Sequence, residues 1–331
     1  MFAVRESDGV LHKASETPVQ LTTGPFLNRQ LRSSEWDRMA ISSDGKKLFV
    51  QNTQSRSELV RYDARSKQFV PFLADVSASG AAFSRDGKWI AYSSAPDSAL
   101  WRSRIDGSER LQLTFAPGVT SQPSWSPDGT KIAYMAAQLG KPWQVFILPA
   151  EGGSPDKLLS DEMGEGDPTW SADGTQLAFA RDYPDRSQDI QIVDMRTRQA
   201  STLPGSHGFY SPRWSPDGRY LAALAFENNS LMLYDFKTQK RSAWVTGTDL
   251  GYPSWSSDSR YVYYESIVAG RPVNSRVMVG VHRPEVLFSM QGLRRYFRYF
   301  AFWSGQAPDN SRLFTRDVST QEIYALDVDF P

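Results

Sequence analysis

Apolar and polar residues alternate along much of the chain, and this pattern predicts strands. An apolar residue recurs at every second position in residues 131–134, 176–179 and 220–224, among others. A period of two buries one face of a strand and exposes the other. No stretch keeps the period of an amphipathic helix for long enough to predict one. The pattern therefore predicts an all-β protein.

A short polar block precedes these runs and repeats along the chain. It consists of a core residue, Ser, a variable residue, Asp and usually Gly, then two polar residues and an apolar run. Pro at the variable position suits a type I turn, Asp can bond nearby backbone, and Gly accepts a positive φ. Each block therefore predicts a hairpin turn. The seven blocks carry Asp44, Asp86, Asp128, Asp173, Asp217, Asp258 and Asp309.

The spacing of the blocks predicts the architecture. Their Asp residues lie 42, 42, 45, 44, 41 and 51 residues apart, the period of one four-stranded blade of a β-propeller. Three residues separate Trp303-Ser304 from Pro308-Asp309 in the last, irregular block. We expect residues 1–331 to form a single β-propeller of seven four-stranded blades. Eight or six blades remain alternatives.

The two ends of the chain are expected to close the ring. Residues 313–316 and 322–326 read as the second and third strands of the last blade, and no fourth strand follows. Residues 19–22 can supply that outer strand and cover an otherwise open edge. Residues 1–15 then become surplus strands or the remnant of a larger parent.

The repeated block carries a family resemblance. Trp-Ser-Pro-Asp-Gly at residues 125–129, followed by Lys-Ile-Ala-Tyr at residues 131–134, resembles the TolB-like family of bacterial β-propeller repeats. Residues 100–110 and 316–327 look like the C-terminal propeller of soil-bacterial regulators, in which a winged-helix DNA-binding domain and a membrane segment come first. This sequence contains neither of these. We therefore carry over the propeller fold, and expect no nucleic-acid partner and no membrane segment.

Composition narrows the classes of function without naming a partner. Lys plus Arg and Asp plus Glu each total 37, so no net charge draws the protein to nucleic acid or to an anionic membrane. The absence of cysteine excludes a disulfide framework, a thiol nucleophile and cysteine-ligated zinc. We expect a monomer. Its compartment stays open: cytoplasmic if Met1 is the natural start, periplasmic if the chain is a fragment of a membrane-anchored regulator.

No catalytic motif stands out. The sequence lacks Gly-x-Ser-x-Gly, Gly-x-x-x-x-Gly-Lys and Gly-x-Gly-x-x-Gly, which accompany nucleophile elbows, phosphate-binding loops and dinucleotide sites. The three histidines, His12, His207 and His282, are too far apart for the close spacing of a zinc site. We expect no catalytic residue, no metal, no cofactor and no enzymatic activity.

Two sets of conspicuous residues are interpreted as parts of the fold. The Asp of each block recurs because every turn needs it, so it does not predict a carboxylate ring. The block tryptophans recur at one repeat position and are expected to pack between blades, not to stack on bases or sugars. They are Trp125, Trp170, Trp214 and Trp255.

Binding residues are expected on the irregular loops opposite the Asp-Gly turns. An acidic loop with Asp161, Glu162, Glu165 and Asp167 matches no EF-hand spacing, so we interpret it as solvated and not as a calcium site. Residues 271–299 hold six arginines and one acid beside several aromatics, a composition of interaction hot spots and of arginine stems that cover a sheet. The predicted binding residues are His207, Tyr210, Tyr252, Arg294, Arg295, Tyr296 and Arg298.

Three functions stay open. The first is a non-catalytic scaffold or sensor domain that binds a protein or peptide on its variable loop face, with the arginine segment as anchor for an acidic partner. The second is binding of a small anionic ligand or carbohydrate in the central funnel. The third is a propeller lyase or hydrolase. A broad apolar and Arg-rich patch would favour the scaffold, and converging His, Glu and Arg would favour the enzyme.

Overall fold

The computed structural model contains strands and no helix among the residues it describes, which confirms the all-β class. None of these residues belongs to a helix long and apolar enough to cross a membrane. The chain divides into two compact units: Met1–Ser55 with Ser319–Pro331, here the flanking unit, and Arg56–Val318, here the propeller unit. The described residues are 2–3, 19–20, 39–42, 46–73, 76–160, 163–225, 229–299 and 302–327.

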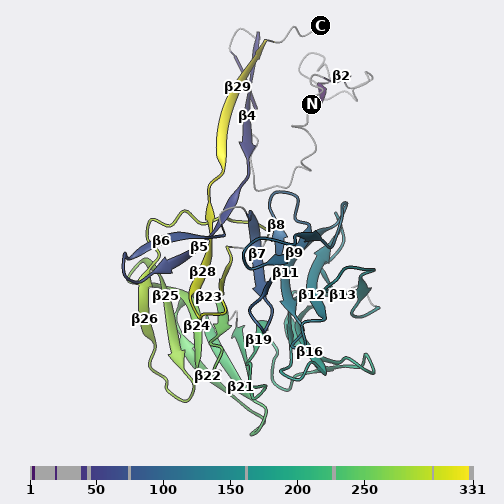
Figure 1. Ribbon diagram of the computed structural model, residues 1–331, viewed down its shortest axis with the longest axis vertical. Helices are drawn as coiled ribbons and strands as arrows, with labels where there is room; N and C mark the ends of the chain where they lie inside the picture. Colours follow the sequence, from purple (N-terminus) through teal and green to yellow (C-terminus); the bar gives the residue numbers. More distant parts are fainter. Residues whose placement is uncertain are drawn as a thin grey trace. The chain divides into compact units, whose positions relative to one another are not determined.

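Five sheets of the propeller unit are each built from four consecutive antiparallel strands (Figure 1). Each begins with the strand that precedes the turn of a repeated block, Asp-Gly in four sheets and Asp258-Ser259 in the fifth, as the repeat predicts. The strands are β7 (Ala78–Phe83), β8 (Trp89–Ser94), β9 (Leu100–Arg104) and β10 (Leu111–Gln112); β11 (Val119–Trp125), β12 (Lys131–Ala137), β13 (Gln144–Pro149) and β14 (Asp156–Lys157); β15 (Gly164–Trp170), β16 (Gln176–Asp182), β17 (Gln188–Asp194) and β18 (Ala200–Thr202); β19 (Phe209–Trp214), β20 (Tyr220–Ala225), β21 (Ser230–Asp235) and β22 (Lys240–Thr246); β23 (Thr248–Trp255), β24 (Tyr261–Val268), β25 (Arg271–Met278) and β26 (Glu285–Ser289).

A sixth four-stranded sheet joins the two ends of the propeller unit. Two strands come from the C-terminal end of the unit and two from its N-terminal end, in the order β27-β28-β5-β6. This corrects the expected last blade, because β5 takes the third position in place of residues 322–326, and β6 the fourth in place of residues 19–22. Pairing strands from both ends covers edges that would otherwise stay open. The strands are β27 (Ser304–Gln306), β28 (Arg312–Asp317), β5 (Ser57–Asp63) and β6 (Gln68–Leu73).

Neighbouring sheets touch through their first strands. β7, β11, β15, β19 and β23 contact one another in succession, and β27 contacts both β23 and β7. The sheets therefore follow one another as the blades of a β-propeller. The expected count of seven blades is not confirmed, since the described part of the propeller unit contains six four-stranded sheets. Asp44 of the first block lies outside the described residues.

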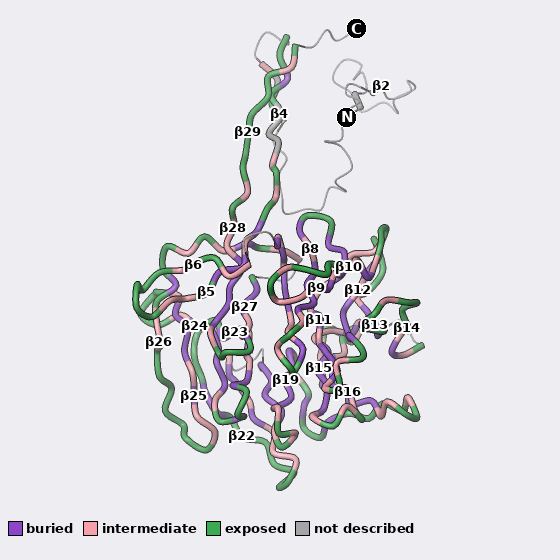
Figure 2. The backbone as a smooth tube through the Cα atoms, viewed as in Figure 1, coloured by how far each residue is buried: buried purple, intermediate pink, exposed green. Residues whose placement is uncertain are grey.

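The flanking unit contains a three-stranded sheet, β29-β4-β3, and a two-stranded sheet, β1-β2. Most residues of β29 are exposed (Figure 2). Residues 19 and 20 of the outer strand expected at 19–22 pair with residues 2 and 3; residues 21 and 22, and most of residues 1–15, lie outside the described residues. The strands are β1 (Phe2–Ala3), β2 (Val19–Gln20), β3 (Met39–Ile41), β4 (Lys47–Gln54) and β29 (Thr320–Asp327).

The block tryptophans are buried between neighbouring sheets, which confirms their interpretation as core residues. Nε1 of Trp170 donates a hydrogen bond of 3.1 Å to the carbonyl oxygen of Ser124 on the preceding first strand. Nε1 of Trp255 reaches the carbonyl of Arg213 in the same way, at 2.8 Å. These indoles fill the core and tie adjacent blades together. The buried block tryptophans are Trp125, Trp170, Trp214 and Trp255.

Hydrogen bonds hold the Asp-Gly turns as the block chemistry predicts. Ser126 Oγ donates to Asp128 Oδ1 at 2.6 Å, and the same carboxylate oxygen accepts the Thr130 N–H at 3.0 Å. These donors, the Ser126 hydroxyl first, hold the pKa of Asp128 below its usual value. The serine hydroxyl makes the same bond in the turns of Asp86, Asp173, Asp217 and Asp258.

Strand direction decides which loops share an end of the blades. Because consecutive strands are antiparallel, the turns from first to second and from third to fourth strands lie at one end, here the turn end. The connections from second to third strands, and from a fourth strand to the next first strand, lie at the opposite end, here the loop end. The predicted binding residues all belong to the loop end.

Candidate functional site

The first strands of the six sheets line one cavity of about 370 Å³, here the central cavity. Its volume lies in the range of ligand pockets, roughly 300–1,000 Å³. Its wall includes Pro127, Ala172 and Pro216 of the Asp-Gly turns and the exposed Arg85. The central cavity therefore reaches the turn end of the blades.

Equivalent residues of the first strands form a ring at one level of the central cavity. Each faces the second-strand residue that lies five positions after the turn Asp, as Ser254 faces Tyr263 and Ser304 faces Phe314. Five of the six ring positions carry a hydroxyl or a charge. The ring residues are Ala82, Ser124, Thr169, Arg213, Ser254 and Ser304.

The register corrects the alignment of the last block. Sequence spacing aligns Ser304 with the serine that binds the turn Asp in other blocks. In the structure Ser304 occupies the ring position, and Gly305 takes the place of the block Trp. Asp309 instead accepts its turn hydrogen bond from the Ser311 hydroxyl, at 2.6 Å. The three extra residues therefore release Ser304 from the turn.

Arg312 lies directly behind two ring serines. Its side chain is buried, with the residue 4% exposed. Nη1 donates to Ser254 Oγ, and Nη2 donates to Ser304 Oγ at 3.2 Å. Burial lowers the pKa of Arg312 to about 10, against the attraction of Glu265, so the guanidinium stays charged at neutral pH. Among the described residues, no carboxylate is hydrogen-bonded to it. Sequence reasoning missed this residue, although it follows the one block of irregular length.

Four first strands carry the same β-bulge beside the ring. The pairing with the second strand shifts there, and a residue other than glycine adopts a positive φ, which costs about 1–2 kcal/mol. Each such residue precedes a Pro and stands three positions before a block Trp, a pattern that sequence analysis missed. The residues are Gln122 (φ 49°), Asp167 (54°), Ser211 (51°) and Tyr252 (54°).

Charged side chains of both signs line the central cavity. Asp167 pairs with Arg213 across neighbouring first strands at 3.2 Å, and both side chains are less than a quarter exposed. Nη1 of Arg85 donates to the carbonyl of Ala172, two sheets away, at 3.3 Å. With Arg312 behind the wall, guanidinium groups outnumber carboxylates here, which favours anions.

A buried ion pair holds the predicted Arg295. The side chains of Glu265 and Arg295 are 9% and 10% exposed and meet at 2.9 Å. Arg295 also donates to the Trp303 carbonyl at 3.0 Å. Burial, followed by the charge of Glu265, raises the pKa of the predicted Tyr252. Arg295 and Tyr252 thus lie together inside the loop end.

The segment around Arg298 crosses to distant sheets at the loop end. Arg298 donates to the hydroxyls of Tyr296, which is buried, at 3.3 Å, and of Tyr299 at 3.2 Å. Burial opposes the charge of Arg298, but Tyr299 and Tyr296 raise its pKa. The Tyr299 hydroxyl lies 2.8 Å from Ser98 Oγ, and its ring centre 5.4 Å from that of Trp143. The connection from β26 to β27 therefore reaches the sheets of β7 and β11 and spans the loop end of the central cavity.

The remaining predicted residues are not part of this cluster. Arg294 is 60% exposed and pairs with Asp317 at 3.0 Å. His207 is exposed, and Tyr210 is half-buried, with its pKa raised chiefly by burial. The structure thus unites Arg295, Tyr296, Arg298 and Tyr252. Arg294 and His207 are exposed, and Tyr210 packs against two clusters of the hydrophobic core.

The acidic loop is interpreted as solvated from its sequence, but its two described acids are largely buried. Asp161 and Glu162 lie outside the described residues. Glu165 is 1% exposed, and its Oε2 accepts the Val145 N–H at 2.9 Å. Asp167 forms the ion pair of the central cavity. Its described acids therefore serve internal contacts. Within the described ranges, no group of three or more His, Asp or Glu residues is arranged to hold a metal ion.

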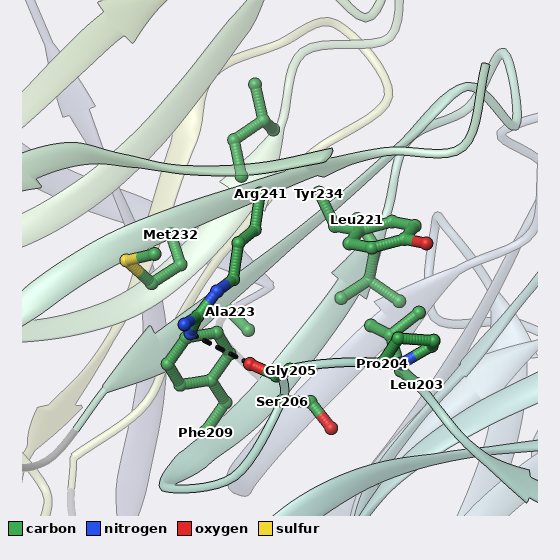
Figure 3. A pocket seen from close by; sticks show the side chains of 11 residues that line it. Leu203, Pro204, Gly205, Ser206, Phe209, Leu221, Ala223, Met232, Tyr234 and Arg241 are labelled. Carbon is green, nitrogen blue, oxygen red and sulfur yellow. Dashed lines mark hydrogen bonds between the residues drawn. The ribbon is translucent and has the colours of Figure 1, made fainter. Parts of the chain in front are cut away.

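A second hollow, between β20, β21 and residues 203–209, is far smaller (Figure 3). Its volume is about 10 Å³. Arg241 lies across it, donates to the Gly205 carbonyl at 2.9 Å and faces the Phe209 ring at 5.7 Å. Such a space holds at most about one water molecule, so we do not consider it a ligand site.

Comparison with known proteins adds a family to these observations. Residues 48–294 match the family model described as the TolB beta propeller domain. An uncharacterized protein of Agrobacterium fabrum is 27% identical over 159 residues, which cover 44% of this chain and 53% of that protein. A TolB homolog of Chlorobium luteolum is 32% identical over 117 residues, which cover 33% of this chain and 25% of that protein. The chain thus spans about half or less of the length of these curated relatives.

Solved structures share the fold. One assigned as TolB from Agrobacterium tumefaciens superimposes with a TM-score of 0.63 at 18% identity, covering 80% of this chain and 99% of that chain. Oligogalacturonate lyase in complex with manganese gives 0.52 at 14% identity, covering 72% and 76%. At these identities the likeness shows the fold alone. The TolB-like propeller expected from the sequence is confirmed, whereas the resemblance to winged-helix regulators is not shown.

Proposed function

The chain belongs to the TolB beta propeller domain family, and on that premise we propose that it is a non-catalytic scaffold that binds a protein or peptide at the loop end of its blades. This is the variable loop face expected from the sequence. The placement of exposed apolar side chains carries the proposal.

Exposed apolar residues are concentrated at the loop end. Within the described propeller unit, eight large hydrophobic residues are exposed, and six of them lie in loop-end connections or where a second strand ends at the loop end. The other two are Val281, in the β25–β26 turn, and Val286, on β26. Exposed apolar groups gathered on one face are typical of an interaction surface. The six are Phe115, Leu139, Val268, Phe297, Phe302 and Val318.

Phe297 and Phe302 are in contact with each other on this surface. Their ring centres lie 5.5 Å apart, and the residues are 53% and 39% exposed. Both sit in the connection that spans the loop end, together with Arg294 and Arg298. Aromatic side chains beside arginine are the usual composition of binding hot spots. The proposal also includes His207, Tyr210 and Tyr252, which the sequence predicts to contact the partner.

Affinity capture from native lysate tests the proposal. Wild-type protein should retain a partner that the double variant Phe297→Ser, Phe302→Ser loses, because the apolar contacts of the two rings are gone. The matched control, Val281→Ser with Val286→Ser, removes exposed apolar groups away from the loop end and should retain the partner. Thermal unfolding checks that both variants are folded. Equal capture by the two double variants would contradict the proposed surface.

The central cavity favours a second function, binding of a small anion, because Arg85 and Arg213 line its wall. Carbohydrate binding, and lyase or hydrolase activity, have no comparable support among the described residues. The likeness to oligogalacturonate lyase is one of fold.

A further inference from the structure

We propose that Ser254 and Ser304 form an oxyanion site, backed by Arg312, which takes a carboxylate or phosphate group entering the central cavity from the turn end. The site deepens the second function above and does not rest on a partner at the loop end. It depends on the irregular last block, which places Ser304 in the ring.

The two hydroxyl groups are left as donors. Each Oγ accepts a hydrogen bond from the Arg312 guanidinium. A serine hydroxyl that accepts can still donate its own proton. Among the described residues neither hydroxyl donates to another group, and both serines belong to the cavity wall. Two polarised O–H groups therefore remain for the oxygen atoms of a ligand.

Positive charge at this wall is in excess. Glu265 attracts Arg312 but already forms the ion pair with Arg295 at 2.9 Å. One buried carboxylate thus serves two buried guanidinium groups. A buried cation without a hydrogen-bonded anion is strongly unfavourable, and an anion bound to the serines offsets that cost. Arg213, at the next ring position, adds positive charge although it pairs with Asp167.

Access favours the turn end. A backbone connection, the one that carries Arg298, spans the loop end. The turn end is bordered by half-buried turn residues and crossed by one exposed side chain, that of Arg85, which reaches the Ala172 carbonyl. A volume of about 370 Å³ accommodates a small organic anion or an acidic side chain of a partner. Both sources present the same oxyanion chemistry.

Calorimetric titration of the full chain distinguishes the sources. The probes are sodium phosphate, sodium succinate and a capped tetra-aspartate peptide, at ionic strength matched with sodium chloride. Binding of phosphate or succinate identifies a free anion, and binding of the peptide alone identifies an acidic side chain. In either case the double variant Ser254→Ala, Ser304→Ala should weaken binding at least about tenfold, since two charge-linked hydrogen bonds are lost.

Ser124→Ala is the matched control, because Ser124 holds the same ring position without an arginine behind it, and it should change Kd by less than about twofold. Arg312→Lys keeps the charge but cannot bond both serines with one planar guanidinium, so it should also weaken binding. It replaces the serine variants in the test if these unfold. Binding of none of the three probes, or equal effects of Ser124→Ala and of the double serine variant, would overturn the site. Either result leaves the loop-end proposal standing, because that proposal is tested with different residues.

Discussion

Serine has one role in the regular blocks and another in the last block. In the third block Ser126 binds Asp128 and accepts the Lys131 N–H at 2.9 Å, so its hydroxyl stabilises the turn. In the last block Ser311 takes over the turn, and Ser304 accepts from the buried Arg312. A change of spacing thus converts a fold residue into a cavity residue. In a repeat protein, therefore, the departures from the repeat point to function more sharply than the repeat itself.

The largest expected effect belongs to the regular blocks. Trp170→Ala should lower the free energy of unfolding by about 3–5 kcal/mol, because it removes a buried ring from the core between two blades. Urea unfolding measures the change. The control is Phe115→Ala, whose ring is 70% exposed and should change stability by less than about 0.5 kcal/mol. Equal effects of the two variants would show that the block tryptophan is not a core residue.

A smaller effect distinguishes the buried charges behind the last block. Glu265→Gln should lower the free energy of unfolding by about 3 kcal/mol, because it leaves Arg295 and Arg312 buried without their carboxylate. Arg312→Met fills a similar volume without charge and should be neutral, or stabilising by about 1 kcal/mol. Urea unfolding of both variants gives the comparison. A strong loss of stability in Arg312→Met would mean that the arginine serves the fold and not a ligand.

Local chemistry explains which features the sequence predicts. The Ser-x-Asp-Gly turns and the alternating strands depend on residues a few positions apart, and both appear as expected. The pairing of β28 with β5 joins residues more than 250 positions apart, for example Phe314 with Val60, and no local signal specifies it. The first block also misleads, since residues 39–41 pair antiparallel with residues 48–50 in the flanking unit and not in a blade of the propeller unit.

The candidate site was less predictable than the fold. An excess of arginine near residue 295 is visible in sequence, but whether each guanidinium is buried depends on distant partners such as Glu265. Arg312 resembles an ordinary first residue of a second strand until the register of Ser304 is known. The bulge pattern can be seen in the sequence: a residue such as Gln122 or Tyr252 stands directly before Pro-x-Trp. Its meaning requires the positive φ values that the structure supplies.

The smallest expected effect concerns acid stability of the regular turns. Hydrogen bonds from the Ser126 hydroxyl and the Thr130 N–H lower the pKa of Asp128 in the folded protein. In the unfolded chain this pKa keeps the ordinary aspartate value of about 3.9. A carboxyl group with a lowered folded pKa adds stability above the unfolded pKa, and this is lost as the pH falls through the folded pKa. The thermal midpoint should therefore fall as the pH decreases from about 4 through the lowered folded pKa of Asp128. Asp128→Asn keeps an acceptor but does not titrate, so its midpoint should fall less over the same window.

The same acid unfolding experiment compares the regular turn of Asp128 with the turn of Asp309 in the last block. Asp309 accepts from Ser311 and has a lowered pKa despite its burial, so Asp309→Asn should reduce the acid loss in the same direction as Asp128→Asn. The control is Asp249→Asn, an exposed position outside the turns, which should leave the acid loss unchanged. If only Asp128→Asn reduced the loss, Ser311 would be an inadequate substitute for the block serine, and the release of Ser304 would carry a cost in stability. Equal reductions would mean that the last block keeps its turn intact while it supplies Ser304 to the central cavity.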